Sequence, residues 1–273
     1  MNNLIKRSIT GIAYIIILAG AIALGQFSYY ILFTIILVIS TLEYSKITEK
    51  METKIMKIPV IIMGFLIFTL TFLTAQKIIT ENWLVITIMP LLIIPLLSLI
   101  QQKTTTIHNV ALTFFGLIYI ILPLSISNYL VFNDIAEPYY VPDLLLYTFL
   151  LIWTNDTFAF ITGKLTGKHK LAQNISPGKT WEGIIGGILF SILVSILIAT
   201  FSNTYPLIHW INLAVIISIS ANLGDLTESI LKRTANVKDS GHILPGHGGI
   251  LDRFDAAFLA IPVVFVYLKC FLA

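Results

Sequence analysis

Charged residues are scarce in this chain: they make up 11% of its 273 residues, whereas hydrophobic residues make up 57%. Soluble domains carry about 25% charged residues, so this composition excludes an ordinary soluble globular protein. Cysteine is almost absent too, and because Cys270 is the single one, no disulfide can form within the chain. The net charge of +3 is small and the basic residues are spread over several loops, so we expect no nucleic-acid partner.

Long apolar runs dominate the sequence. They approach the length of about 20 residues with which a helix spans a bilayer, and short polar segments separate them. A transmembrane β-barrel would show short alternating segments instead. We therefore predict an all-α polytopic membrane protein with about nine transmembrane helices. The predicted spans are residues 9–25, 28–42, 58–75, 83–100, 109–131, 143–162, 182–202, 206–226 and 254–273. A re-entrant pair formed by the first two spans, and a total of about eight, is the alternative.

The positions of lysine and arginine predict the orientation, because cytoplasmic loops collect these residues. With a cytoplasmic N-terminus, all 17 lysines and arginines except Lys77 and Lys269 lie in cytoplasmic segments. The first span also resembles a signal peptide, but its cleavage would not change the orientation of the later loops. The compact chain and simple loops suit the plasma (inner) membrane of a bacterium, with the active site on the cytoplasmic side.

No soluble domain, low-complexity tract or internal repeat interrupts the apolar runs, so we predict a single integral membrane domain over residues 1–273. Residues 1–142 have the pattern of generic membrane helices, and residues 143–273 hold the predicted catalytic helices and cytoplasmic loops. Two of these loops, at residues 163–181 and 225–255, differ from the rest in composition. We expect the chemistry to reside there and in polar groups within the helices.

Carboxylates gather in the second of these loops. Five of the 14 acidic residues of the chain lie there: Asp225, Glu228, Asp239, Asp252 and Asp255. Such groups repel one another unless a cation lies between them, and oxygen ligands favour Mg²⁺ or Mn²⁺ over Zn²⁺. We therefore predict a Mg²⁺ site, able to accept Mn²⁺, that works with a nucleotide. The alternative to a metal-binding role for Glu228 is an ion pair with Lys232, one helical turn later.

The same loop contains the run Pro245–Gly249, whose backbone can approach an anion closely. It predicts that His247, Gly248 and Gly249 contact phosphate. A flexible turn, in which the histidine caps the following helix, is the alternative.

The first loop and the span before it supply further candidates. Lys179 is a candidate phosphate-binding point charge, although the glycine spacing before it excludes a P-loop. Ser176 is either a phosphate contact or a helix cap. Asp156 lies within an apolar span, where an ionisable residue is costly, so we expect it to face a polar cavity. A buried Asn-Asp hydrogen-bond pair between helices is the alternative.

These segments together resemble the phosphatidate cytidylyltransferases, also called CDP-diacylglycerol synthases. The resemblance is carried, in register, by Ser229, Lys232, Arg233, Lys238, Asp239, Gly241, Pro245, His247, Gly248, Gly249, Asp252, Arg253 and Asp255. The segments Ser176–Gly183, Asn155–Asp156 and Gly224–Ser229 resemble the family as well. The resemblance thus covers residues 150–273, whereas the first half of the chain resembles only generic membrane helices.

The resemblance implies a multi-helical, Mg²⁺-dependent enzyme, commonly a homodimer, that transfers the cytidylyl group of CTP to phosphatidate. The products would be CDP-diacylglycerol and pyrophosphate, in phospholipid biosynthesis. Expected partners are therefore CTP, phosphatidate and membrane lipid. A related enzyme acting on a prenyl-ether lipid, a secondary transporter and a membrane scaffold are the alternatives, and the carboxylate-rich loop argues against the last two.

The resemblance and the charges together imply a role for each candidate residue. We expect catalysis by Asp225, Lys238, Asp239, Asp252 and Arg253. We expect substrate binding by Asp156, Ser176, Lys179, Lys232, Arg233, His247, Gly248 and Gly249. We expect metal binding by Asp225, Asp239, Asp252, Asp255 and Glu228.

Overall fold

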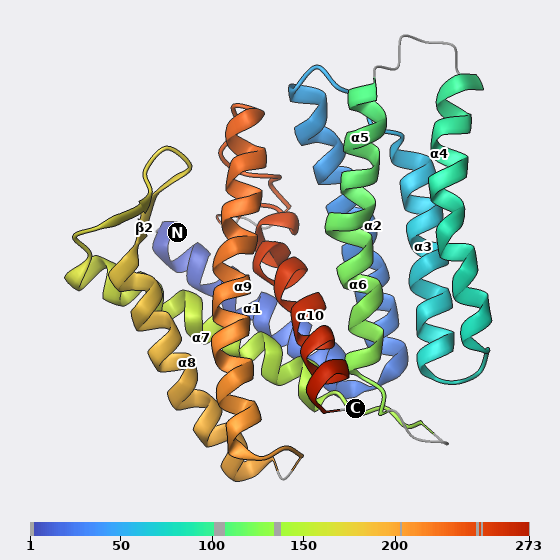
Figure 1. Ribbon diagram of the computed structural model, residues 1–273. Coiled ribbons are helices and arrows are strands. Elements are labelled where there is room, and N and C mark those ends of the chain that lie inside the picture. The colour runs from blue at the N-terminus through green and yellow to red at the C-terminus, as the bar shows by residue number, and fades with distance from the viewer. Residues whose placement is uncertain are drawn as a thin grey trace. The chain divides into compact units, whose positions relative to one another are not determined.

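A computed structural model describes residues 3–100, 107–133, 138–202, 204–243, 246 and 248–272, with the backbone alone for residues 3–8. The chain forms two compact units, whose elements are labelled in Figure 1. The first unit comprises residues 1–143 and 234–253. The second unit comprises residues 144–233 and 254–273.

The first unit contains the helices of the N-terminal half. In chain order they are α1 (Asn3–Leu24), α2 (Gln26–Lys50), α3 (Lys57–Ala75), the 3₁₀ helix η1 (Glu81–Ile88), α4 (Met89–Ile100), α5 (Ile107–Gly116), the π-helical turn η2 (Leu117–Ile121), α6 (Leu122–Ile126) and the 3₁₀ turn η3 (Ser127–Leu130). Gly25 alone separates α1 from α2, and its φ of 140° is accessible to glycine but strained for other residues. Pro123 lacks the N–H that would continue the helical ladder, which accounts for the π-helical turn just before it.

A buried polar network joins three elements of the first unit. The Tyr29 hydroxyl lies 2.6 Å from Ser127 Oγ and donates a hydrogen bond to Asn128 Oδ1 at 3.0 Å. The Asn128 amide in turn donates to the Phe68 carbonyl and to Thr71 Oγ1. Because these groups are buried, each hydrogen bond offsets the cost of removing polar atoms from water. The network therefore fixes α2, α3 and η3 to one another.

The second unit is helical apart from one hairpin. Its elements are most of α7 (Asp143–Thr166), β1 (Lys170–Ala172), β2 (Ser176–Thr180), α8 (Trp181–Phe201), most of α9 (Leu207–Thr234) and most of α10 (Leu251–Phe271). The two strands are antiparallel, with Lys170 opposite Thr180 and Ala172 opposite Ser176. Figure 1 shows β2 running directly into α8.

Glycines allow α8 to lie close to α7. Thr180 caps α8, since its hydroxyl accepts a hydrogen bond from Gly183 N at 3.1 Å. A Cβ added at Gly183 would lie 2.7 Å from the Ala159 carbonyl oxygen, and one added at Gly187 would lie 2.6 Å from Asn155 Oδ1. The Gly-x-x-x-Gly spacing of these two residues therefore serves helix packing.

Eight helical segments in the described part of the chain are long and apolar enough to span a membrane. They are residues 26–50, 57–75, 81–100, 107–130, 143–166, 181–201, 207–234 and 251–271. The apolar part of α1, Ile9–Leu24, is shorter. The predicted all-α polytopic membrane fold is thus confirmed, with the hairpin as a small addition that the apolar runs did not indicate.

Gly224 should be intolerant of any side chain. A Cβ there would overlap the Asp255 carbonyl oxygen and lie 3.1 Å from Ala256 Cα, so α9 and α10 would have to separate. We expect Gly224→Ala to lower the free energy of unfolding by about 1–3 kcal/mol, the usual cost of overpacking. Thermal unfolding in detergent would measure the loss. The matched control is Gly178→Ala, because nothing lies within 4 Å of a Cβ at Gly178. Equal melting temperatures for the two variants would contradict this account.

Candidate active site

Three carboxylates meet in the second unit. Asp225 and Glu228 lie one turn apart towards the end of α9, and Asp255 lies near the start of α10. One oxygen from each lies within 4.8 Å of the other two. The Glu228 side chain is fully buried, with 0% exposed, whereas 38% of the Asp225 side chain is exposed. The cluster therefore extends from the interior of the unit to an accessible surface.

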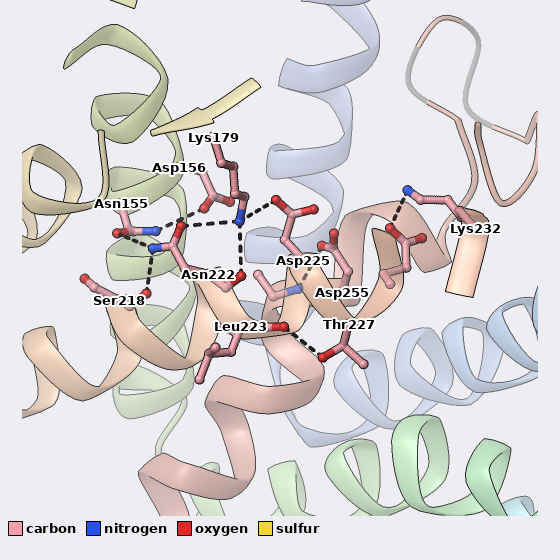
Figure 2. Close-up of polar contacts among 12 residues, drawn as sticks. Asn155, Asp156, Lys179, Ser218, Asn222, Leu223, Asp225, Thr227, Lys232 and Asp255 are labelled. Atoms are coloured by element: carbon pink, nitrogen blue, oxygen red, sulfur yellow. Dashed lines mark hydrogen bonds and ion pairs between the residues drawn. The ribbon is translucent and has the colours of Figure 1, made fainter. Parts of the chain in front are cut away.

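Two lysines compensate these carboxylates. Lys179 Nζ, from β2, lies 2.6 Å from Asp225 Oδ2, and Lys232 Nζ lies 2.5 Å from Glu228 Oε2. Lys179 also donates to the carbonyl oxygen and to Oδ1 of Asn222, at 3.1 and 3.3 Å. Figure 2 shows Lys179 and Lys232 on opposite sides of the cluster. Both ammonium groups are shielded from water, so salt screens these ion pairs less than it would screen exposed ones.

Side-chain amides continue from the cluster to Asp156. Asn222 Nδ2 donates to Asn155 Oδ1 at 3.3 Å and to the Ser218 carbonyl at 2.8 Å. Asn155 Nδ2 in turn donates to Asp156 Oδ1 at 3.2 Å, and Figure 2 shows this series of contacts between α7 and α9. Asn155 is buried, whereas Asp156 is exposed at a cavity. Asp156 thus faces a polar cavity and bonds Asn155 of its own helix, so it does not form a buried pair between helices.

The cavity has a volume of about 450 Å³ and adjoins the cluster through Asp225. Its polar lining consists of Asp156, Lys164, Lys170, Ser176, Lys179, Thr180, Asn222 and Asp225. The three lysines give the cavity a lining suited to an anionic ligand, and its volume lies in the usual range of about 300–1,000 Å³ for small-molecule sites. Lys164 and Lys170 were not among the predicted site residues. The unusual composition of residues 163–181 was the signal that could have identified them.

The carboxylate cluster fits a hard divalent cation. Mg²⁺ takes oxygen ligands at about 2.0–2.1 Å in an octahedral array, which places neighbouring and opposite ligand oxygens about 3–4 Å apart. The oxygens of Asp225, Glu228 and Asp255 lie within 4.8 Å of one another, so small side-chain movements would bring them to one ion. The group consists of carboxylates alone, and this donor set suits Mg²⁺ or Mn²⁺ better than Zn²⁺.

The other two predicted metal-binding carboxylates lie in the first unit. Asp252 Oδ2 accepts hydrogen bonds from Ser240 N at 3.0 Å, Ser240 Oγ at 2.9 Å and Gly249 N at 2.8 Å. Gly248 has a φ of 82°, and a Cβ there would overlap Asp252 Oδ2. Asp239 is exposed. Hydrogen bonds from the loop therefore hold Asp252. Gly249 donates one of them, and Gly248 leaves space for the carboxylate.

The remaining predicted residues are basic or lie outside the described residues. Lys238 and Arg253 of the first unit are exposed, and the Arg253 carbonyl accepts a hydrogen bond from the Tyr14 hydroxyl at 3.3 Å. Arg233 of the second unit donates through Nε to the Ile175 carbonyl of the hairpin at 3.3 Å. His247 lies outside the described residues. Lys232 forms an ion pair with Glu228, which was the alternative to a metal-binding role for Glu228. Glu228 also belongs to the carboxylate cluster.

One buried carboxylate was missed by the sequence interpretation. Glu43 of α2 accepts hydrogen bonds from the Ser240 hydroxyl and from Leu251 N, within the first unit. Glu43 directly follows the predicted span 28–42, so an acidic residue at the border of an apolar run was the available signal, because charge within a membrane span is costly.

Comparison with known proteins places this site in context. A sequence model of the cytidylyltransferase family matches residues 5–271. The phosphatidate cytidylyltransferase of Staphylococcus haemolyticus (strain JCSC1435) is 52% identical over 126 residues, which are 45% of this chain and 48% of that protein. That of Haemophilus influenzae is 40% identical over 173 residues, which are 62% of this chain and 56% of that protein. The chain thus spans about half the length of the curated relatives it matches.

Removal of one carboxylate from the cluster should weaken cation binding. We expect Asp255→Asn to reduce Mn²⁺ affinity about 10- to 100-fold, because a charged ligand becomes a neutral one. Electron paramagnetic resonance of free Mn²⁺ in detergent solution would measure the affinity. Asp143→Asn is the matched control, since this carboxylate is exposed at the start of α7 and is not part of the cluster formed by Asp225, Glu228 and Asp255. Wild-type affinity in Asp255→Asn would contradict the assignment.

Proposed function

The chain belongs to the cytidylyltransferase family, and from this premise we propose that it transfers the cytidylyl group of CTP to phosphatidate. The observation that carries the proposal is the carboxylate cluster beside a lysine-lined cavity, built from helices of membrane-spanning length. The two relatives named above, which are phosphatidate cytidylyltransferases, support the choice of substrates.

The proposed reaction is a displacement at phosphorus. A phosphate oxygen of phosphatidate attacks the α-phosphorus of CTP, a new P–O bond forms, and the bond between the α-phosphorus and the leaving pyrophosphate breaks. The products are CDP-diacylglycerol and pyrophosphate. The second pKa of a phosphomonoester is about 6, so the attacking oxygen is already largely deprotonated at neutral pH. Hence no side chain needs to act as a general base.

The main barrier is the mutual repulsion of two highly anionic substrates. Lys164, Lys170 and Lys179 line the cavity and supply positive charge where phosphates would bind. A Mg²⁺ ion bound by Asp225, Glu228 and Asp255 would add positive charge that neutralises and aligns the phosphates. Lys179, which pairs with Asp225, would transfer to a phosphate oxygen when substrate enters.

A lipid acceptor suits this cavity. Phe160 lines it and is nevertheless 70% exposed, as expected where a site among membrane helices opens towards acyl chains. CTP would arrive from water while the acyl chains stay among the helices. A prenyl-ether lipid phosphate has the same head-group chemistry, so acceptor identity is decided by assay and not by the charged residues.

Pyrophosphate release tests the proposed reaction. Purified protein in detergent should release pyrophosphate only when phosphatidate, CTP and Mg²⁺ are all present. We expect Asp225→Asn to lower the rate at least about 100-fold, because it removes both a cation ligand and the partner of Lys179.

The assay needs one control variant and one control acceptor. Asp143→Asn should retain wild-type activity for the reason given above. Release with a prenyl-ether lipid phosphate and none with phosphatidate would change the acceptor, and no release with either would refute the proposed transfer.

We further propose that the N-terminus and the loops at residues 163–181 and 225–255 face the cytoplasm of a bacterial plasma membrane. The distribution of lysine and arginine supports this orientation, and CTP is a cytoplasmic substrate. A homodimer, implied by the resemblance, remains a prediction to be tested by the mass of the detergent complex.

Cysteine labelling can test the orientation. In a Cys270→Ser background, Lys168→Cys places a thiol at an exposed position between α7 and β1, and Thr80→Cys places one at an exposed position directly before η1. A membrane-impermeant maleimide should label Thr80→Cys in right-side-out vesicles and Lys168→Cys only in inverted ones, because these loops lie on opposite sides in the proposed topology. The reverse pattern would overturn the orientation.

A further inference from the structure

Glu43 is a buried carboxylate of the first unit, with 2% of its surface exposed. Its Oε2 accepts hydrogen bonds from Leu251 N at 2.8 Å and from Ser240 Oγ at 3.2 Å. Among the described residues, Oε1 accepts no hydrogen bond, although it is buried. Burying a carboxylate within an apolar helix costs free energy, so we expect Glu43 to have a function that requires it there.

Two glycines make room for this carboxylate. A Cβ at Gly241 would overlap Glu43 Oε1, and its three nearest atoms would all belong to the Glu43 side chain. A Cβ at Gly249 would overlap both Glu43 Oε2 and Ser240 Oγ. Neither glycine has a positive φ, so space and not backbone conformation requires glycine there. Ser240, Gly241, Gly249 and Leu251 therefore surround the end of the Glu43 side chain.

The same contacts reach Asp252. Ser240 Oγ contacts both carboxylates, at 3.2 Å to Glu43 Oε2 and 2.9 Å to Asp252 Oδ2. Ser240 N and Gly249 N donate to Asp252 as well. Because Glu43 accepts hydrogen bonds from Ser240 and Leu251, it restrains both stretches, 240–241 and 249–251, that supply the donors to Asp252.

We propose that Glu43 is a positioning residue for the cytidylyl transfer. It holds residues 240–241 and 249–251 in the arrangement that orients the Asp252 carboxylate and the Gly249 amide, and it acts through these groups without touching substrate. This inference rests on the proposed function, because the segment carries Gly248 and Gly249, which are predicted to bind substrate, and donates hydrogen bonds to Asp252, a predicted catalytic residue.

Steady-state kinetics of four proteins test this role: wild type, Glu43→Ala, Glu43→Gln and Glu49→Ala. Glu43→Ala should lower kcat/KM for CTP about 10- to 100-fold per folded enzyme, since two hydrogen bonds to a buried charge are lost. Glu43→Gln should recover most of the activity, because its amide oxygen still accepts a hydrogen bond from Leu251 N. Glu49→Ala is the matched control on α2, where an exposed carboxylate pairs with Lys57 at 3.6 Å, and should stay within about twofold of wild type.

A double-mutant cycle tests the fit between the carboxylate and the loop. Gly241→Ala alone should cost activity, because its Cβ meets Glu43. In the Glu43→Ala background the same substitution should cost little more, so the two losses should not add. Simple additivity would show that Glu43 does not set the position of this loop.

The outcomes separate the positioning role from a purely structural one and from the proposed function. Unchanged kinetic constants per folded enzyme in Glu43→Ala would overturn the inference, even with a lowered melting temperature. If wild type releases no pyrophosphate, the proposed function fails. Amide hydrogen exchange then decides the role of Glu43 independently: faster exchange at Gly249 and Leu251 in Glu43→Ala supports the clamp, and unchanged exchange refutes it.

Discussion

Compensation of buried charge is the constraint on which this site depends. Helices of membrane-spanning length can hold carboxylates only where positive groups or hydrogen-bond donors balance them. In the second unit Lys179 and Lys232 supply this balance for Asp225 and Glu228. Three carboxylates face two lysines, so a further cation would relieve the repulsion among the carboxylates.

The hairpin follows from the same requirement. Lys179 reaches Asp225 because β2 carries it to the end of α9, and Thr180 immediately afterwards caps α8. One short segment thus brings the Lys179 ammonium group to Asp225, caps α8 and contributes Ser176 to the cavity wall. Because Lys179 has a flexible side chain, it can exchange a carboxylate for a phosphate without displacement of the helices. Such an exchange would let substrate entry and cation binding support each other.

The sequence predicted the parts of this picture that depend on composition and short spacing. Continuous apolar runs indicated the spans, and the spacing of Asp225 and Glu228 placed both on one side of a helix end. The hairpin was not predictable, because its strands are short and Ser176–Thr180 contains a proline and a glycine. Glu43 was missed because its partners lie about 200 residues away in sequence, at Ser240 and Leu251, where periodicity carries no information.

Asp225 and Asp252 differ in the kind of partner that holds each carboxylate. Asp225 is paired with a lysine that can move, so its partner is exchangeable. Asp252 accepts hydrogen bonds from two backbone amides, and these donors cannot leave unless the loop itself changes shape. The first arrangement suits a group that changes partners as ligands bind. The second suits a group whose direction must stay constant, and in that case the buried residue behind the loop, Glu43, matters as much as the loop.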